Sequence, residues 1–158
     1  MGLFSKPKPI DQFNANYFEL KTIAFKNMIE FRPLIEKEIG KIEDDEYDVL
    51  CLRCIDYLLG ADHPEPGPGS SARTLRIYQK MYKKAPIVAP KIRKVPMLDA
   101  YFAAILDYKD EVLAELLGDE WSETAEAKRV RKIISNTPAS IEDTEDYRQL
   151  WAMLTTLK

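Results

Sequence analysis

Histidine and cysteine are nearly missing from this chain of 158 residues, which contains one histidine and two cysteines. A single histidine cannot form a two-histidine metal site, and a histidine-dependent nucleophile would have to use His63. Two cysteines are too few for the disulfide framework of a small secreted domain. Six glycines and ten prolines are far fewer than a low-complexity chain contains. The composition is that of an ordinary globular protein.

Long apolar runs and glycine-rich phosphate loops are missing as well. No segment is apolar over the length of a membrane span or a signal peptide, so we expect a cytoplasmic protein with no membrane partner. Neither GxxxxGK[ST] nor GxGxxG occurs. The length predicts one domain over 1–158, with a flexible tail over 1–10. The net charge of −3 is too small to indicate a strongly charged partner by itself.

Apolar residues recur at intervals of three and four over most of the chain, which is typical of amphipathic helices. We predict helices over about 13–31, 33–39, 44–59, 72–84, 98–117, 122–135 and 147–157. Gly40, Gly60 and Gly118 follow three of them, where glycine commonly ends a helix. No alternating strand pattern of comparable length is present. The prediction is all-α, a single compact bundle of about six or seven helices, with a short helical-repeat solenoid as the alternative.

Proline marks two predicted breaks in this helical pattern. Residues 60–72 contain three prolines at alternate positions with glycine and serine, which favours a loop with an extended path. Residues 85–96 contain Pro86, Pro90 and Pro96 among apolar residues. A helix there would lose backbone hydrogen bonds at each proline, so we predict an extended connector anchored by apolar side chains.

Charge is strongly segregated along the chain. No acid occurs from position 73 to 94, whereas 95–127 has nine acids and only Lys109 as a cation. We predict two basic clusters as the partner-binding residues: Arg73, Arg76, Lys80, Lys83, Lys84, Lys91, Arg93 and Lys94, then Lys128, Arg129, Arg131 and Lys132. If both clusters share a face, they form a basic stripe for an acidic protein or for phosphates. The alternative is internal pairing with the acidic helices on either side.

Other chemically suggestive residues have simpler interpretations. Cys51 and Cys54 form a CxxC that fits a dithiol, or a zinc site with His63, but both lie on an apolar helical stripe and favour burial. Carboxylates at helical spacing fit a Mg²⁺-dependent nucleotide hydrolase: Asp107, Asp110, Glu111 and Glu115. Tyr108 and Lys109 beside them favour an ordinary polar face instead. We predict no catalytic residues, no metal ligands and no cofactor.

The predicted helix over 13–31 has an unusually aromatic face, made of Phe13, Tyr17, Phe18, Phe25 and Phe31. Such a face suits core packing, and it also suits a homodimer seam. We favour core packing with one edge of the face left for a partner.

These observations favour a small cytoplasmic, non-enzymatic protein–protein interaction module, which is an adaptor, inhibitor or assembly factor. It would bind an acidic partner protein through its basic segment. The first alternative is a nucleic-acid-binding protein that uses the same two basic clusters. The second is the Mg²⁺-dependent nucleotide hydrolase.

Overall fold

The computed structural model describes residues 8–61, 66–137 and 145–155, and every regular element in them is a helix. The helices are α1 (Pro9–Glu30), α2 (Arg32–Ile39), α3 (Asp44–Leu58), α4 (Ala72–Ile92), α5 (Pro96–Leu117), α6 (Asp119–Ser122), α7 (Ala125–Asn136) and α8 (Glu145–Thr155). The prediction of an all-α bundle is confirmed. This part of the chain has eight helices because α6 and α7 replace the single helix predicted over 122–135.

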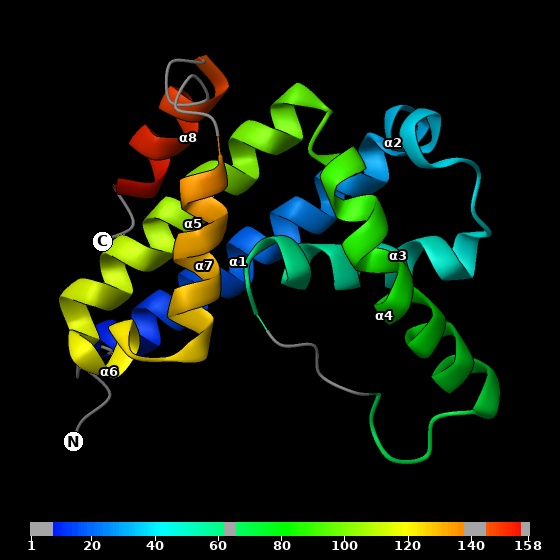
Figure 1. Cartoon of the computed structure of the whole chain (residues 1–158), viewed down its shortest axis with the longest axis horizontal. Helices are drawn as coiled ribbons and strands as arrows, with labels where there is room; N and C mark the ends of the chain where they lie inside the picture. The colour runs from blue at the N-terminus through cyan, green and yellow to red at the C-terminus, as the bar shows by residue number, and fades with distance from the viewer. Residues whose placement is uncertain (1–7, 62–65, 138–144, 156–158) are drawn as a thin grey trace, which may run out of the picture.

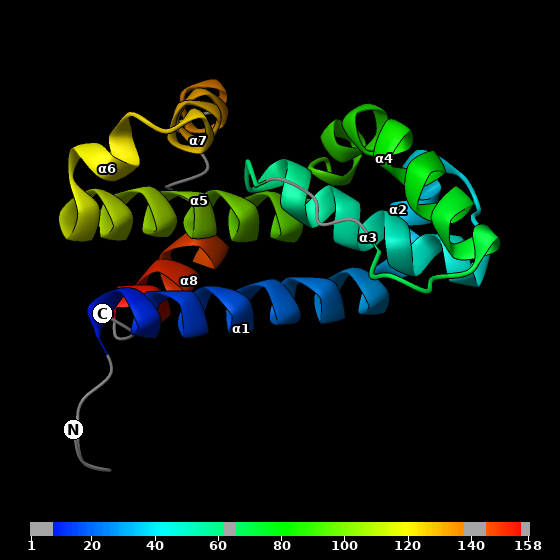
Figure 2. The same cartoon turned by 90° about the horizontal axis from the view of Figure 1, so that it is seen from below.

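Two long helices, α1 and α5, form the middle of the bundle (Figure 1). They lie side by side and run antiparallel, as Figure 2 shows. Helices α6, α7 and α8 pack on α5, whereas α2 and α3 pack on α4 at the other end of the molecule. Helix α1 contacts α2 and α3 as well as α5, so it joins the two ends.

The core contains large side chains, among them tyrosines whose hydroxyls form hydrogen bonds. Helix α5 contributes more buried residues to it than any other helix, and Leu98, Phe102 and Ile105 are all at most 1% exposed. Tyr47 and Tyr101 are also buried, and their hydroxyls donate hydrogen bonds to the carbonyls of Met28 (2.6 Å) and Leu20 (3.0 Å). Each fully buried large apolar side chain contributes about 1.5–3 kcal/mol relative to its exposed state. These hydroxyl bonds remove the cost of burying a polar group.

The helix ends follow local capping chemistry. Helix α1 begins at Pro9, a favourable first helical residue because its missing N–H is not needed there. The predicted flexible tail over 1–10 is therefore wrong for positions 9 and 10, and 1–7 lie outside the described residues. The hydroxyl of Thr124 accepts a hydrogen bond from the N–H of Ala127 (3.0 Å), so Thr124 caps α7. Ser122, the first residue of the helix predicted over 122–135, is instead the last residue of α6.

The predicted extended connector over 85–96 is wrong for most of its length. Helix α4 continues through Pro86 and Pro90 to Ile92, and α5 begins at Pro96 after a short turn. The apolar side chains of this segment recur at helical spacing, and Ala85, Val88 and Ile92 are all buried. Their burial is gained only in the helical conformation, and it outweighs the hydrogen bonds that the two prolines cannot donate.

The loop predicted over 60–72 is described only in part. Residues 66–71 are not helical, and 62–65, which include His63, lie outside the described residues. The hydroxyl of Ser71 accepts a hydrogen bond from the N–H of Thr74 (3.1 Å), so Ser71 caps α4. Across the described ranges, no helix is both long enough and apolar enough to cross a membrane.

Candidate functional site

The first basic cluster lies mainly along one side of α4. Six cations of this helix recur at steps of three, four and seven, which places them on one helical face. We call this set the α4 basic face: Arg73, Arg76, Lys80, Lys83, Lys84 and Lys91. The buried residues of α4, such as Met81 and Val88, lie on a different side of the helix. The face is therefore directed away from the core.

The centre of the α4 basic face is a shallow hollow of about 470 Å³. Its lining consists of Arg76, Gln79, Lys80, Lys83, Lys84 and Ile87. The side chain of Ile87 is 66% exposed, so an apolar group lies among the cations. The hollow combines positive charge with one apolar contact, which is the composition of a binding surface for an acidic and partly apolar segment.

Carboxylates of α3 pair with two cations of this face. Arg73 donates to Asp45, and Lys80 donates to Glu46 at 2.9 Å. These acids belong to the first turn of α3, where their negative charges also interact favourably with the positive end of the helix dipole. Within the described ranges, no carboxylate pairs with Arg76, Lys83 or Lys84. The prediction of internal pairing therefore holds for part of the cluster only.

Arg93 and Lys94 directly follow α4, and they differ in how far their side chains are exposed. Arg93 forms an ion pair with Asp99, and both side chains are less than a fifth exposed. Its guanidinium also donates to the hydroxyl of Thr137 (3.3 Å). Arg93 thus ties the α4–α5 turn to the end of α7 instead of facing a partner. Lys94 is exposed.

The second basic cluster lies on α7 and does not continue the first. Arg131 pairs with Asp110 at 3.0 Å, and Arg129 donates to the carbonyl of Gly60 at 3.0 Å. Lys128 and Lys132 are exposed. Helix α7 packs on α5 and α6, whereas α4 packs on α2 and α3 at the other end (Figure 1). The two clusters therefore form separate surfaces and not one basic stripe.

The carboxylates of α5 make hydrogen bonds within the protein. Asp110 accepts from Trp121 Nε1 (2.8 Å) as well as from Arg131, and Asp107 accepts from the hydroxyl of Tyr147. In the part of the chain that the structure describes, no group of three or more potential metal ligands is placed to hold an ion. These contacts fix Asp110 and Asp107 as links from α5 to α6, α7 and α8.

Lys109, expected on a polar face, is buried and only 2% exposed. Its Nζ donates to Glu126 of α7, to the hydroxyl of Tyr17 (3.1 Å) and to the carbonyl of Leu59 (3.3 Å). Burial lowers the pKa of Lys109, although Glu126 opposes this shift. Tyr108 is buried as well. Lys109 therefore connects four helical segments, and its lack of exposure excludes the polar face predicted at this place.

Cys51 and Cys54 are both buried and free, as the apolar stripe predicted. Burial raises the pKa of Cys51 to about 12, and burial also raises the pKa of Cys54. A thiol with so high a pKa is almost wholly protonated at neutral pH, and the thiol form is a poor nucleophile. Both side chains lie on the buried side of α3 and pack in the core as small apolar residues.

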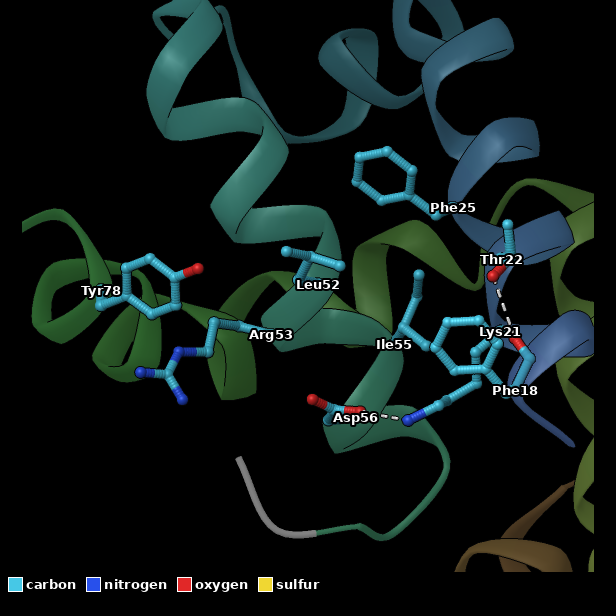
Figure 3. Close-up of a pocket in the computed structure, with 9 residues that line it drawn as sticks. All are labelled: Phe18, Lys21, Thr22, Phe25, Leu52, Arg53, Ile55, Asp56 and Tyr78. Atoms are coloured by element: carbon cyan, nitrogen blue, oxygen red, sulfur yellow. Dashed lines mark hydrogen bonds and ion pairs between the residues drawn. The ribbon is translucent and has the colours of Figure 1, made fainter. Parts of the chain in front are cut away.

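A second concave surface lies between α1, α3 and α4 (Figure 3). This cavity has a volume of about 330 Å³. Its lining is mainly apolar and consists of Phe18, Lys21, Thr22, Phe25, Leu52, Arg53, Ile55, Asp56 and Tyr78. Phe18 is 70% exposed, whereas Phe13 of the same helix is buried. Tyr17, Phe25 and Phe31 are partly buried against the core, so the aromatic face of α1 packs on the core and leaves Phe18 exposed at its edge.

Comparisons of the chain with protein-family models, with curated proteins and with solved structures find no match. Its function must be inferred from the geometry of its own residues. Two surfaces offer that geometry, namely the α4 basic face and the cavity between α1, α3 and α4.

Proposed function

We propose that this protein is a non-enzymatic binding protein that holds an acidic segment of a partner protein on its α4 basic face. The observation that carries the proposal is the set of Arg76, Lys83 and Lys84 around exposed Ile87, with no carboxylate partner among the described residues. Unpaired surface cations in a concave surface attract anionic groups and raise the rate of encounter.

The spacing of these cations suits a short helical or extended acidic segment. With a rise of about 1.5 Å per residue, the distance along α4 from Arg76 to Lys84 is about 12 Å. A partner with two or three carboxylates over that length can reach all three cations. An apolar side chain beside those carboxylates can contact Ile87, which adds the hydrophobic component that charge pairs alone lack.

The surroundings of the face favour a protein partner over a nucleic acid. Asp45 and Glu46 border the basic face where they pair with Arg73 and Lys80, and Asp45 is 44% exposed. Acids along one border repel a long polyanion but leave room for a short acidic segment. The second basic cluster on α7 lies on another surface, so it does not extend the face into a longer track for phosphates.

The test is binding of a fluorescent peptide with glutamates at helical spacing around one leucine, measured by anisotropy at low salt. The variant pair is Lys83→Glu/Lys84→Glu and Lys128→Glu/Lys132→Glu, which change the net charge equally. An exposed ion pair is worth roughly 0.5 kcal/mol, and reversal replaces it by a repulsion of similar size. Two reversals therefore cost about 2 kcal/mol, or about a 30-fold loss of affinity, for the α4 variant.

The α7 variant is expected to bind the peptide nearly as well as the unmodified protein. Equal losses in both variants would mean that net charge, and not the α4 basic face, governs binding. A single-stranded oligonucleotide of the same length serves as the competitor. If it binds more tightly than the peptide, with a steep loss between low and moderate salt, the nucleic-acid alternative replaces this proposal.

A further inference from the structure

Arg53 of α3 is a buried cation without the partners that a buried charge normally has. It is 2% exposed, and its Nε and Nη1 atoms make no hydrogen bond to any residue that the structure describes. No carboxylate of the described ranges forms an ion pair with it. Lys109, which is equally buried, makes three hydrogen bonds, one of them to a carboxylate. The contrast shows that this fold satisfies one buried cation and leaves the other unsatisfied.

Aromatic rings are the contacts that stabilise the Arg53 guanidinium. It lies 5.1 Å from the ring centroid of Tyr78 and 5.3 Å from that of Tyr82, both on α4. Cation–π contacts offset part of the cost of removing a charge from water, but the N–H donors of Nε and Nη1 stay unused. A planar guanidinium with free donors is well suited to a carboxylate, which it can bind through two parallel hydrogen bonds.

The unsatisfied arginine lines the apolar cavity described above. Figure 3 shows Arg53 and Tyr78 on the α4 side of this cavity, with Phe18 and Phe25 of α1 on the opposite side and Leu52 between them. Large apolar groups are left in water at its edge, since Phe18 is 70% and Leu52 is 43% exposed. A volume of about 330 Å³ lies within the range of small-molecule sites.

The charges in the cavity wall favour an anionic ligand. Lys21 and Asp56 face each other, with Nζ and Oδ1 3.6 Å apart, so their charges largely cancel. The positive charge of Arg53 remains. A complementary ligand has one negative end for this arginine and an apolar body for the phenylalanine and leucine side chains.

We propose that the cavity between α1, α3 and α4 binds a small amphipathic carboxylate of the fatty-acid type. Its carboxylate accepts hydrogen bonds from Arg53, and its hydrocarbon body packs against Phe18, Phe25 and Leu52. This site is separate from the α4 basic face, so it goes beyond the proposed function and does not depend on it.

The test uses octanoate as the probe, with octanol and octylammonium as matched neutral and cationic probes, and it measures affinity by titration calorimetry. Octanoate is expected to bind saturably and at least about tenfold more tightly than octanol, because hydrogen bonds to a charged group favour the anion. Octylammonium is expected to bind more weakly than octanol. Equal affinity for octanoate and octanol, or no saturable binding of octanoate, overturns the proposal.

Three variants assign the binding to this cavity. Arg53→Met replaces the unsatisfied guanidinium with an unbranched apolar side chain, so we expect the variant to fold. Its affinity for octanoate is expected to fall to that for octanol. Leu52→Trp changes an exposed residue and fills the cavity mouth, which lowers octanoate affinity about tenfold by exclusion. Arg76→Met, on the α4 basic face, leaves octanoate affinity unchanged. Unaltered octanoate binding by the Arg53→Met variant, with an unchanged melting profile, overturns the proposal.

Discussion

Replacing Gly60 with alanine tests the junction at which the end of α3 meets α7. Gly60 has φ of +73°, a left-handed conformation that residues with a side chain rarely adopt. A Cβ atom added at this position would lie 2.8 Å from Cγ2 and 3.3 Å from the backbone N of Val130. Val130 is fully buried, so it has little room to move.

Two contributions make up the expected loss of stability. The left-handed conformation costs about 1–2 kcal/mol for alanine, and overlap with a buried side chain costs about 1–3 kcal/mol more. Gly69→Ala is the matched control, because Gly69 also has a positive φ, of +85°, in a turn closed by the hydrogen bond from Ser70 N to Gly67 O, and no atom lies within 4 Å of its added Cβ. It should lose only the conformational part. The difference between the two variants, about 1–3 kcal/mol, measures the contact with Val130.

The assay is urea unfolding followed by circular dichroism, with the free energy of unfolding extrapolated to water for both variants. Gly60→Ala is expected to have the lower midpoint and an unchanged slope. If Gly69→Ala loses as much stability as Gly60→Ala, then Val130 of α7 does not pack closely on Gly60.

Three further predictions concern buried polar groups. Glu126→Gln leaves the ammonium of Lys109 without its carboxylate and should lower the free energy of unfolding by about 2 kcal/mol. The double variant Lys109→Met/Glu126→Leu removes both charges and should recover most of that lost stability. A loss below about 0.5 kcal/mol for Glu126→Gln, measured by urea unfolding, would contradict the buried pair. Cys51 and Cys54 should resist iodoacetamide at neutral pH until denaturant is added, and rapid native labelling would contradict their burial. Because the pKa of Cys51 rises from 9.0 to about 12 on folding, its effect on stability is constant below pH 9 and becomes unfavourable as pH rises toward 12.

Most helices could be predicted from the sequence because their apolar residues repeat with the helical period. Helix α3 is an example, since Leu50, Cys54 and Leu58 mark its buried side and acids occupy its first turn. A repeat of this kind is local, because a few turns of the helix contain enough residues to show it. Glycine at position 40 likewise marks the end of α2 through local backbone preference.

The end of α4 could not be predicted correctly from the sequence, because the tendency of proline to end a helix competes there with packing in the core. Pro86 and Pro90 predict a break on local grounds. The structure keeps the helix because Ala85, Val88 and Ile92 all enter the core beyond the point where the rule would end it. The free energy of that burial depends on α3 and other helices, whose positions a single sequence does not specify.

The candidate sites could be predicted only in outline for the same reason. The run of cations from 73 to 94 is visible in the sequence, but the pairing of Lys80 with Glu46 and of Arg93 with Asp99 depends on the fold. Burial of Arg53 and Lys109 gives no local signal, because a long charged side chain usually keeps its charged end in water.

The most direct test of the proposed function is a two-dimensional amide NMR titration of the uniformly ¹⁵N-labelled protein with the acidic peptide. Shifts are expected to concentrate on α4 around Arg76, Lys80, Lys83, Lys84 and Ile87, and to follow one saturable binding curve. Shifts confined to 128–132 on α7, or no shifts at peptide concentrations that saturate the anisotropy signal, would contradict binding at the α4 basic face.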